Sequence, residues 1–241
     1  MVVITQAAPV QIPVVNVVNN ELKLNSSRCI RFVAPTEVEL ESTLEALPTI
    51  KRGDHQFTDS WQGVADMCQA IDDFMENEKD NDLLIHKSVL EIGFTTGLPS
   101  LLALDSGAAD VTVHSLDKLS SELFIAPTFK RNQISRTLYK SDHQCMTNLA
   151  TKKFDVILAP ELTASDEELF PLLHDILDAA LSPNGIILLS ARPFYEHCSG
   201  SIQGFLDLVK HRGCFDAHVR WTSPKSELAP RQLIQLTRSL R

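Results

Sequence analysis

From residue 88 onward the sequence alternates between short apolar runs and amphipathic segments, and this alternation restricts the possible folds more than any other feature. The apolar runs have the length of strands, and the segments between them have the spacing of helices. Strands that alternate with helices form a mostly parallel sheet with helices on both faces. The last two runs, 215–221 and 233–240, follow each other without a helix, so we expect an antiparallel pair there.

The remaining elements of this part follow from the same periodicities. We expect strands at 88–92, 110–116, 136–139, 154–159 and 185–191, and helices at 61–75, 98–106, 122–133, 166–181 and 201–211.

The first part of the chain does not follow this alternation and is rich in Val, Asn and Pro. We therefore divide the chain into an N-terminal extension or cover, residues 1–57, and a main domain, residues 58–241. Within the extension we expect strand pieces at 14–18, 21–24 and 29–33, a short helix at 37–47 and a polar loop at 51–60.

Composition excludes several classes of protein. The chain has a net charge of −9, so it lacks the excess of Lys and Arg that drives binding to phosphates. We therefore expect no direct nucleic-acid partner. None of the five cysteines forms a C-x-x-C pair and the eight histidines are scattered, so we expect no metal site. No apolar run approaches the ~20 residues of a membrane span. We expect a monomer of the cytosol, with the nucleus as a second location.

The turn after the run 88–92 carries the clearest chemical signal. Gly93 permits a tight turn in which the backbone can approach a ligand, and Gly97 lies where the next helix begins. Pro99 suits a first helical turn, where its missing N–H has no partner anyway. Such a turn presents backbone N–H groups and the positive end of a helix dipole, although plain structural turns share the pattern.

Two carboxylates accompany this turn. Asp117 follows the strand 110–116 and can accept bonds from both hydroxyls of a ribose, or it can cap the next segment. Glu91 lies inside an apolar run, where a carboxylate is costly without a partner. That partner is the α-amino group of a bound amino acid, a nearby backbone N–H, or a local Lys or Arg. The pattern predicts a nucleoside bound between the glycine turn and Asp117.

These residues resemble a known family. The segment 89–97, followed by Asp117, is similar to motif I and the ribose-binding acidic position of the S-adenosylmethionine-dependent methyltransferases. The segment 154–161 resembles strand four of small protein methyltransferases that include the lysine methyltransferases related to valosin-containing-protein methyltransferase. The likeness covers the chain from about Thr58 to the C-terminus.

One branch of that family matches best, the histidine protein methyltransferases. The features that resemble this branch are the segment 181–191, Phe194 with Tyr195, the segment 200–205, Trp61 ahead of its amphipathic helix, and Asn132 after Pro127.

The resemblance implies a Rossmann-like seven-stranded sheet with an antiparallel last strand, and S-adenosyl-L-methionine as the cofactor. It implies methyl transfer to a protein, in the histidine branch to an imidazole nitrogen, often on a ribosomal protein. Glu161 would be the catalytic residue on the acceptor side, orienting the substrate or accepting its proton, unless it caps the helix that starts at Asp166. By matched position the cofactor would be bound by Trp61, Glu91, Gly93, Gly97, Asp117 and Asp142.

The sequence departs from the family at three positions. Thr95 stands where the family has a central glycine, Ala164 where it often has an aromatic residue, and Gln62 where a glutamate usually follows the tryptophan. These departures keep open a non-catalytic, methyltransferase-like binding or scaffold protein. A protein-lysine methyltransferase is a further alternative. An NAD-binding oxidoreductase is disfavoured, because no close G-x-G pair is present.

Overall fold

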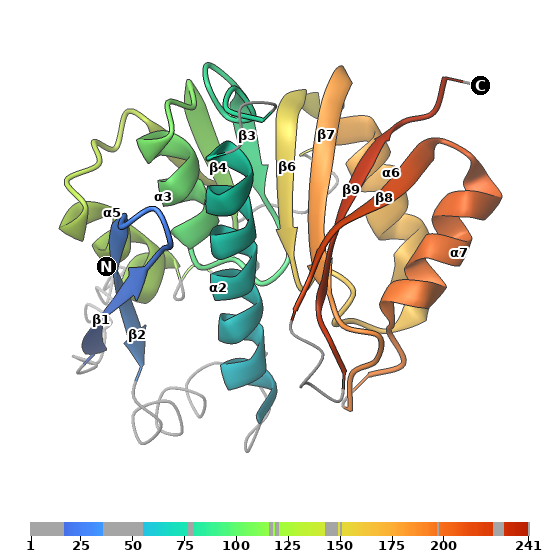
Figure 1. Ribbon diagram of the computed structural model, residues 1–241, viewed down its shortest axis with the longest axis horizontal. Helices are drawn as coiled ribbons and strands as arrows, with labels where there is room; N and C mark the ends of the chain where they lie inside the picture. Colours follow the sequence, from blue (N-terminus) through green and yellow to red (C-terminus); the bar gives the residue numbers. More distant parts are fainter. Residues whose placement is uncertain are drawn as a thin grey trace, which may run out of the picture.

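The computed structural model describes residues 17–35, 55–76, 80–115, 118, 121–142, 149, 151–196, 198–223 and 229–240. Its centre is a seven-stranded sheet (Figure 1). The strands are β3 (Ser88–Glu91), β4 (Asp110–His114), β5 (Tyr139–Asp142), β6 (Phe154–Pro160), β7 (Leu181–Ala191), β8 (Phe215–Thr222) and β9 (Gln232–Arg238).

The order of these strands is β5-β4-β3-β6-β7-β9-β8. The five strands from β3 to β7 are parallel to one another, and β9 runs antiparallel to both β7 and β8. The prediction of a Rossmann-like, mostly parallel sheet with an antiparallel last strand is therefore confirmed. The direction in which the chain adds strands reverses between β3 and β6, which are neighbours in the sheet. Ligands of open α/β sheets bind at such a switch point, outside the carboxyl ends of the strands.

Helices cover both faces of the sheet. They are α2 (His55–Met75), α3 (Leu98–Asp105), α5 (Ala126–Arg131), α6 (Phe170–Ala180) and α7 (Ile202–Arg212), with a π-helical turn η1 (Ser121–Ile125) before α5 and a 3₁₀ turn η3 (Glu167–Leu169) before α6. None of the helices in the described part of the chain is long and apolar enough to cross a membrane.

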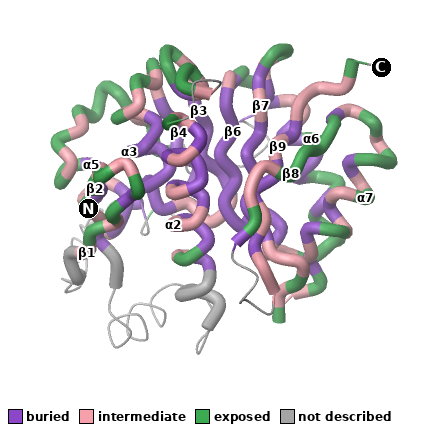
Figure 2. The backbone as a smooth tube through the Cα atoms, viewed as in Figure 1, coloured by how far each residue is buried: buried purple, intermediate pink, exposed green. Residues whose placement is uncertain are grey.

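The core has two halves because successive residues of a strand point to opposite faces of the sheet. Val89 packs in one hydrophobic cluster with residues of α2, α3 and α5, and its neighbour Leu90 packs in the other with residues of α6 and α7. Leu188 and Leu189 of β7 are divided in the same way. Figure 2 shows the buried central strands between the two helical layers.

Several predicted boundaries are wrong. Residues 136 and 137 form a turn, so the strand expected at 136–139 begins only at Tyr139. Helix α2 begins at His55, so most of the loop expected at 51–60 is helical and the proposed domain boundary at residue 57 falls inside this helix. Strand β7 begins at Leu181 rather than at residue 185, with a register irregularity against β6.

Ahead of the main sheet, β1 (Val17–Lys23) and β2 (Cys29–Pro35) form an antiparallel hairpin. Strand β2 covers the run expected at 29–33, whereas β1 is one strand where two pieces, 14–18 and 21–24, were expected. Its turn is docked on α2 by the fully buried Asp72, which accepts bonds from the backbone N–H of Ser26 at 3.0 Å and from its hydroxyl at 2.7 Å. Residues 1–16 and the helix expected at 37–47 lie outside the described residues.

The other side of the hairpin lies against α5 (Figure 1). The side chain of Asn132 continues the strand ladder: its oxygen accepts from the N–H of Arg31 at 3.1 Å, and its amide nitrogen donates to the carbonyl of Arg31 at 2.6 Å. The hydroxyl of Thr128 accepts from the N–H of Val33 at 3.0 Å. The hairpin is thus attached to the main domain by directional bonds from two helices.

We expect Asn132→Asp to loosen this attachment. The carboxylate keeps the acceptor but places a second oxygen against the carbonyl of Arg31, so about 1–2 kcal/mol of stability should be lost. Hydrogen exchange at the amide of Arg31 should accelerate. Gln133→Glu is the matched control, because it makes the same chemical change at an exposed neighbouring position. Unchanged exchange in Asn132→Asp would mean that this bond pair does not hold the hairpin.

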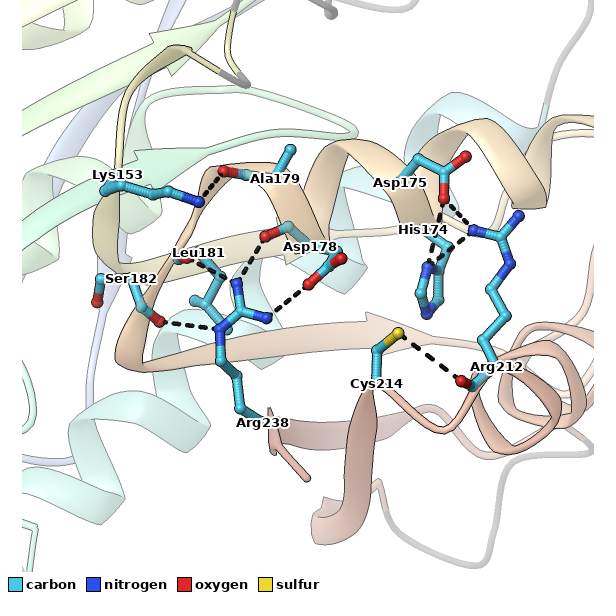
Figure 3. Close-up of polar contacts among 10 residues, drawn as sticks. All are labelled: Lys153, His174, Asp175, Asp178, Ala179, Leu181, Ser182, Arg212, Cys214 and Arg238. Atoms are coloured by element: carbon cyan, nitrogen blue, oxygen red, sulfur yellow. Dashed lines mark hydrogen bonds and ion pairs between the residues drawn. The ribbon is translucent and has the colours of Figure 1, made fainter. Parts of the chain in front are cut away.

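Polar contacts connect α6 to β9 and to the end of α7 (Figure 3). Arg238 of β9 donates to the backbone carbonyls of Asp178 and Leu181, at 2.6 and 2.9 Å, so a cation occupies the negative end of the helix dipole. The buried imidazole of His174 has its Nδ1 3.1 Å from the guanidinium of Arg212, and its ring lies 5.3 Å from that of Phe215. Burial, and then the charge of Arg212, lower the pKa of His174.

This lowered pKa predicts a loss of stability in mild acid. Unfolded His174 has an ordinary pKa of about 6.5, so below this pH the unfolded chain binds a proton that the folded protein resists. Stability should fall as the pH drops through about 6.5 toward the lower folded value. His174→Asn retains an acceptor for Arg212 but cannot titrate, so its melting temperature should fall less between pH 7.5 and pH 5.5. If the melting temperatures of the two proteins fall equally between these pH values, the loss of stability does not come from His174.

Candidate functional site

The loop between β3 and α3 is tied to the end of β6. Gly93 has a φ of +107°, a conformation that L side chains rarely adopt. A Cβ built on Gly93 would lie 2.4 Å from the carbonyl oxygen of Pro160. The next residue, Phe94, donates its N–H to the same oxygen at 2.8 Å. Only glycine allows the loop to approach β6 this closely.

Glu91 holds the loop from the inside. One carboxylate oxygen accepts from the backbone N–H groups of Thr96 and Gly97, at 2.8 and 2.9 Å, and the other accepts from Ser100 N–H at 3.1 Å. The side chain is fully buried. Burial raises the pKa of Glu91, and the bonds from Ser100, Gly97 and Thr96 lower it by less than burial raises it. Of the partners that the sequence allows, the backbone N–H groups are the ones that these contacts identify.

Gly97 closes the loop against α5. Its φ is +82°, and a Cβ there would lie 2.7 Å from Cε2 of the Phe129 ring and 3.3 Å from Cγ2 of Ile125. The Phe129 ring in turn stacks on Tyr139 of β5, with 4.1 Å between ring centroids. The end of the loop and the start of α3 are therefore positioned by the neighbouring part of the sheet.

Trp61 reaches this loop from α2. Its indole stacks on Phe32 of the hairpin with 5.3 Å between centroids, and it lies edge-on to Phe94 of the loop at 6.1 Å. The structure thus brings together four of the predicted cofactor residues: Trp61, Glu91, Gly93 and Gly97.

The other two predicted cofactor residues are only partly covered by the structure. Asp117 lies outside the described residues. The backbone of Asp142 ends β5 and pairs with His114 at the end of β4, so it belongs to the carboxyl edge of the sheet. The side chain of Asp142 lies outside the described set.

Glu161 stands directly after β6 in an unusual backbone conformation, with a φ of +51°. Such a φ in a non-glycine residue is strained and concentrates at functional sites. The side chain is only 4% exposed, and its two oxygens accept from Arg231 Nε at 2.6 Å and from the Tyr195 hydroxyl at 2.8 Å. The alternative prediction, a cap for the helix at Asp166, is wrong, because the carboxylate binds these two residues instead.

The network around Glu161 extends to α2. Arg231 is fully buried, and its second nitrogen lies 2.6 Å from the carboxylate of Asp66. A Cβ on Gly63 would lie 2.1 Å from Oε1 of Glu161, so α2 packs directly on this carboxylate. Burial raises the pKa of Glu161, and the charge of Arg231 and the bond from Tyr195 oppose this rise.

Sequence reasoning missed Asp66 and Arg231, and it noted Tyr195 only within a resembling segment. Arg231 is 70 residues from Glu161 and 165 from Asp66, so no local pattern links the three. Among the residues that the structure describes, no group of His, Cys, Asp and Glu could hold a metal ion. The described site has two parts at one edge of the sheet, a glycine loop beside Trp61 and a buried ionic network at the end of β6.

The fold is similar to those of solved methyltransferases. Magnesium protoporphyrin IX methyltransferase from Synechocystis PCC 6803, with bound SAM, matches with a TM-score of 0.57 at 16% identity, over 83% of this chain and 93% of that one. The 1,6-didemethyltoxoflavin N1-methyltransferase of Burkholderia thailandensis, with bound S-adenosylhomocysteine, matches with a TM-score of 0.56 at 16% identity, over 87% and 95%. At these identities the likeness shows the fold.

A third solved structure, the ribosomal protein L11 methylase of Lactobacillus delbrueckii subsp. bulgaricus, matches with a TM-score of 0.53 at 16% identity, over 80% of this chain and 83% of that one. No protein-family model matches the chain. A much closer likeness in sequence is that to uncharacterized protein F22B7.9 of Caenorhabditis elegans, 43% identical over 229 residues, which are 92% of this chain and 94% of the relative. The chain belongs to the same family as this nematode protein, and it has the Rossmann-like fold of the S-adenosylmethionine-dependent methyltransferases.

Proposed function

We propose that this protein is an S-adenosyl-L-methionine-dependent methyltransferase that acts on a protein side chain, with the imidazole of histidine as the favoured acceptor. One observation carries the proposal: a glycine turn at the sheet's switch point, held from inside by Glu91 and contacted by Trp61 through Phe94. Two of the solved structures with a similar fold contain bound SAM or S-adenosylhomocysteine. For the substrate we propose a protein of the cytosol or nucleus, with ribosomal proteins as the first class to test.

The residues at the turn fit this cofactor. Gly93 and Gly97 leave the loop without side chains at two positions, and the loop leads directly into the N-terminus of α3. In the proposed arrangement the loop binds the methionine part and Trp61 packs beside it. Asp117 accepts bonds from the ribose, and Asp142 lies near the adenine. Glu91 acts on the cofactor indirectly, by holding the loop in shape.

Bound S-adenosyl-L-methionine supplies a methyl group on a positively charged sulfur. The protein must place an acceptor lone pair in line with the S–CH₃ bond and exclude water from the site. Imidazole has a pKa of about 6.5, so near neutral pH much of it has a free lone pair without any base. After transfer, the methylated ring loses its remaining acidic proton to water.

The pairing of the Glu161 carboxylate with Arg231 favours an acceptor that is already neutral, such as imidazole. A lysine ammonium has to lose a proton before transfer, and a free carboxylate would assist that step. Glu161 is enclosed and paired with Arg231, and the same guanidinium also pairs with Asp66. We therefore propose that Glu161 orients the acceptor side through Tyr195 and does not act as a free base.

Titration calorimetry with S-adenosylhomocysteine tests the first half of the proposal, and absence of heat together with an unchanged melting temperature would reject it. The second half needs the purified protein, labelled S-adenosyl-L-methionine and a lysate from cells that lack this protein. Mass spectrometry of the labelled proteins should find methylhistidine. Label on lysine alone would replace histidine by lysine as the acceptor.

A second candidate function is a binding protein that keeps the fold without the reaction. Two observations favour it: Thr95 in the centre of the glycine loop, and the closed network around Glu161. The two candidates differ in one result. A protein that binds S-adenosylhomocysteine but labels nothing in the deficient lysate is the binding protein.

A further inference from the structure

Arg231 is the largest fully buried side chain in the described part of the chain, and it directly precedes β9. Its guanidinium joins two carboxylates on different elements, Glu161 after β6 and Asp66 on α2, each at 2.6 Å. Its backbone is also fixed, because the N–H donates to the Ser223 hydroxyl at 2.9 Å and the carbonyl accepts from Ser223 N–H at 2.8 Å. Arg231 therefore links three parts of the fold at one point.

A buried cation between two carboxylates is a costly way to obtain stability alone, since apolar replacements of such groups are often neutral or stabilising. The planar guanidinium can, however, hold two acceptors in fixed directions, which an apolar side chain cannot do. The arrangement therefore specifies where α2 lies relative to the end of β6. Gly63 confirms how tight this contact is, because there is no room for a Cβ beside Glu161.

The position of α2 matters for the cofactor side of the site. Trp61 lies on this helix five residues before Asp66, and its ring contacts Phe94 of the glycine loop. Phe94 is in turn bonded to Pro160, the residue that precedes Glu161. A path of direct contacts thus leads from Arg231 through Asp66 and α2 to the loop, and a second path leads through Glu161 and the end of β6.

We propose that Arg231 is a positioning residue: it holds α2 against the end of β6 and thereby sets Trp61 against the loop that binds the cofactor. Arg231 does not touch the reacting atoms in this assignment. Its removal should therefore weaken cofactor binding at a distance, through the displacement of Trp61. The binding readout of this inference rests on the proposed function, whereas the displacement of Trp61 does not.

The chain has two tryptophans, so Trp221→Phe leaves Trp61 as a single fluorescent reporter. In this background, Arg231→Met should shift the Trp61 emission to longer wavelength and weaken S-adenosylhomocysteine binding about tenfold or more, measured where circular dichroism shows the variant folded. Arg231→Lys can bridge only one carboxylate at a time and should give a smaller change of both kinds. This milder variant carries the test if Arg231→Met does not fold.

Arg220→Met is the matched control. Arg220 also pairs with a carboxylate, Asp80 at 2.7 Å, and it lies over the ring of Phe74, but these contacts are at the far end of α2. Its replacement should lower the melting temperature and leave Trp61 emission and binding unchanged. An Arg231 variant that is only less stable, with native emission and affinity, would overturn the inference. A wild-type protein that binds no S-adenosylhomocysteine rejects the proposed function, and the emission shift still decides the role of Arg231.

Discussion

Gly93→Ala should destabilise the protein and abolish measurable binding of S-adenosylhomocysteine. The new Cβ would lie 2.4 Å from the carbonyl oxygen of Pro160, so the loop has to move away from β6. A strained φ costs about 1–3 kcal/mol, and overpacking adds about the same. The bond from Phe94 to Pro160 would be lost with the movement, and the loop would no longer present its backbone at the switch point. Melting curves and calorimetry measure the two effects.

Gly107→Ala separates strain from crowding. Gly107 has a similar φ of +91°, but a Cβ there would meet its nearest neighbour, a carbon of Ile85, at the ordinary distance of 3.8 Å. This control should lose only the stability that the positive φ costs and should bind normally. Equal binding by the Gly93 and Gly107 variants would show that the loop does not need its contact with β6, and our placement of the cofactor would be wrong.

Glu91→Ala should have the second large effect. Three buried backbone N–H groups, those of Thr96, Gly97 and Ser100, would lose their acceptor at once. Each unsatisfied buried donor costs about 1–3 kcal/mol. The cost of burying the carboxylate, which raises its pKa, is relieved by the change, but the three N–H groups stay buried without an acceptor. We expect a loss of about 3 kcal/mol or more in the free energy of unfolding, and much weaker cofactor binding.

Glu91→Gln divides this effect between shape and charge. The amide oxygen can still accept from Thr96 and Gly97, but the amide nitrogen faces the N–H of Ser100, so an intermediate loss is expected. The exposed Glu168 provides the control, because Glu168→Ala should change neither stability nor binding. Normal affinity in Glu91→Ala would mean that the loop keeps its shape without this carboxylate.

Much of the main domain could be predicted from local patterns. A strand in the centre of the sheet is buried on both faces and is therefore apolar throughout, whereas a covering helix is apolar on one face only. The alternation of these two patterns from residue 88 onward therefore indicates the sheet and the order of its elements. The antiparallel last strand followed from a missing helix between two runs. The boundary at 136–139 was wrong because a turn by residues 136 and 137 carries no strong local signal.

The glycine loop was also visible in the sequence, for a local reason. Gly93 and Gly97 adopt positive φ values, and the need for such values is a property of single residues. The partner of Glu91 was not visible in the same way. A carboxylate in an apolar run demands a partner, yet three kinds were possible, and only the path of the loop around that side chain selects the backbone N–H groups.

The sequence by itself therefore determined the α/β class, the order of strands and helices, and the glycine turn between β3 and α3, since each of these depends on the periodicity or the backbone freedom of neighbouring residues. Only the tertiary structure decided that Arg231 joins Glu161 and Asp66, and that α2 closes over them. The physical reason is separation along the chain: these charges come from distant segments, and each is stable when buried only because folding brings the others within bonding distance.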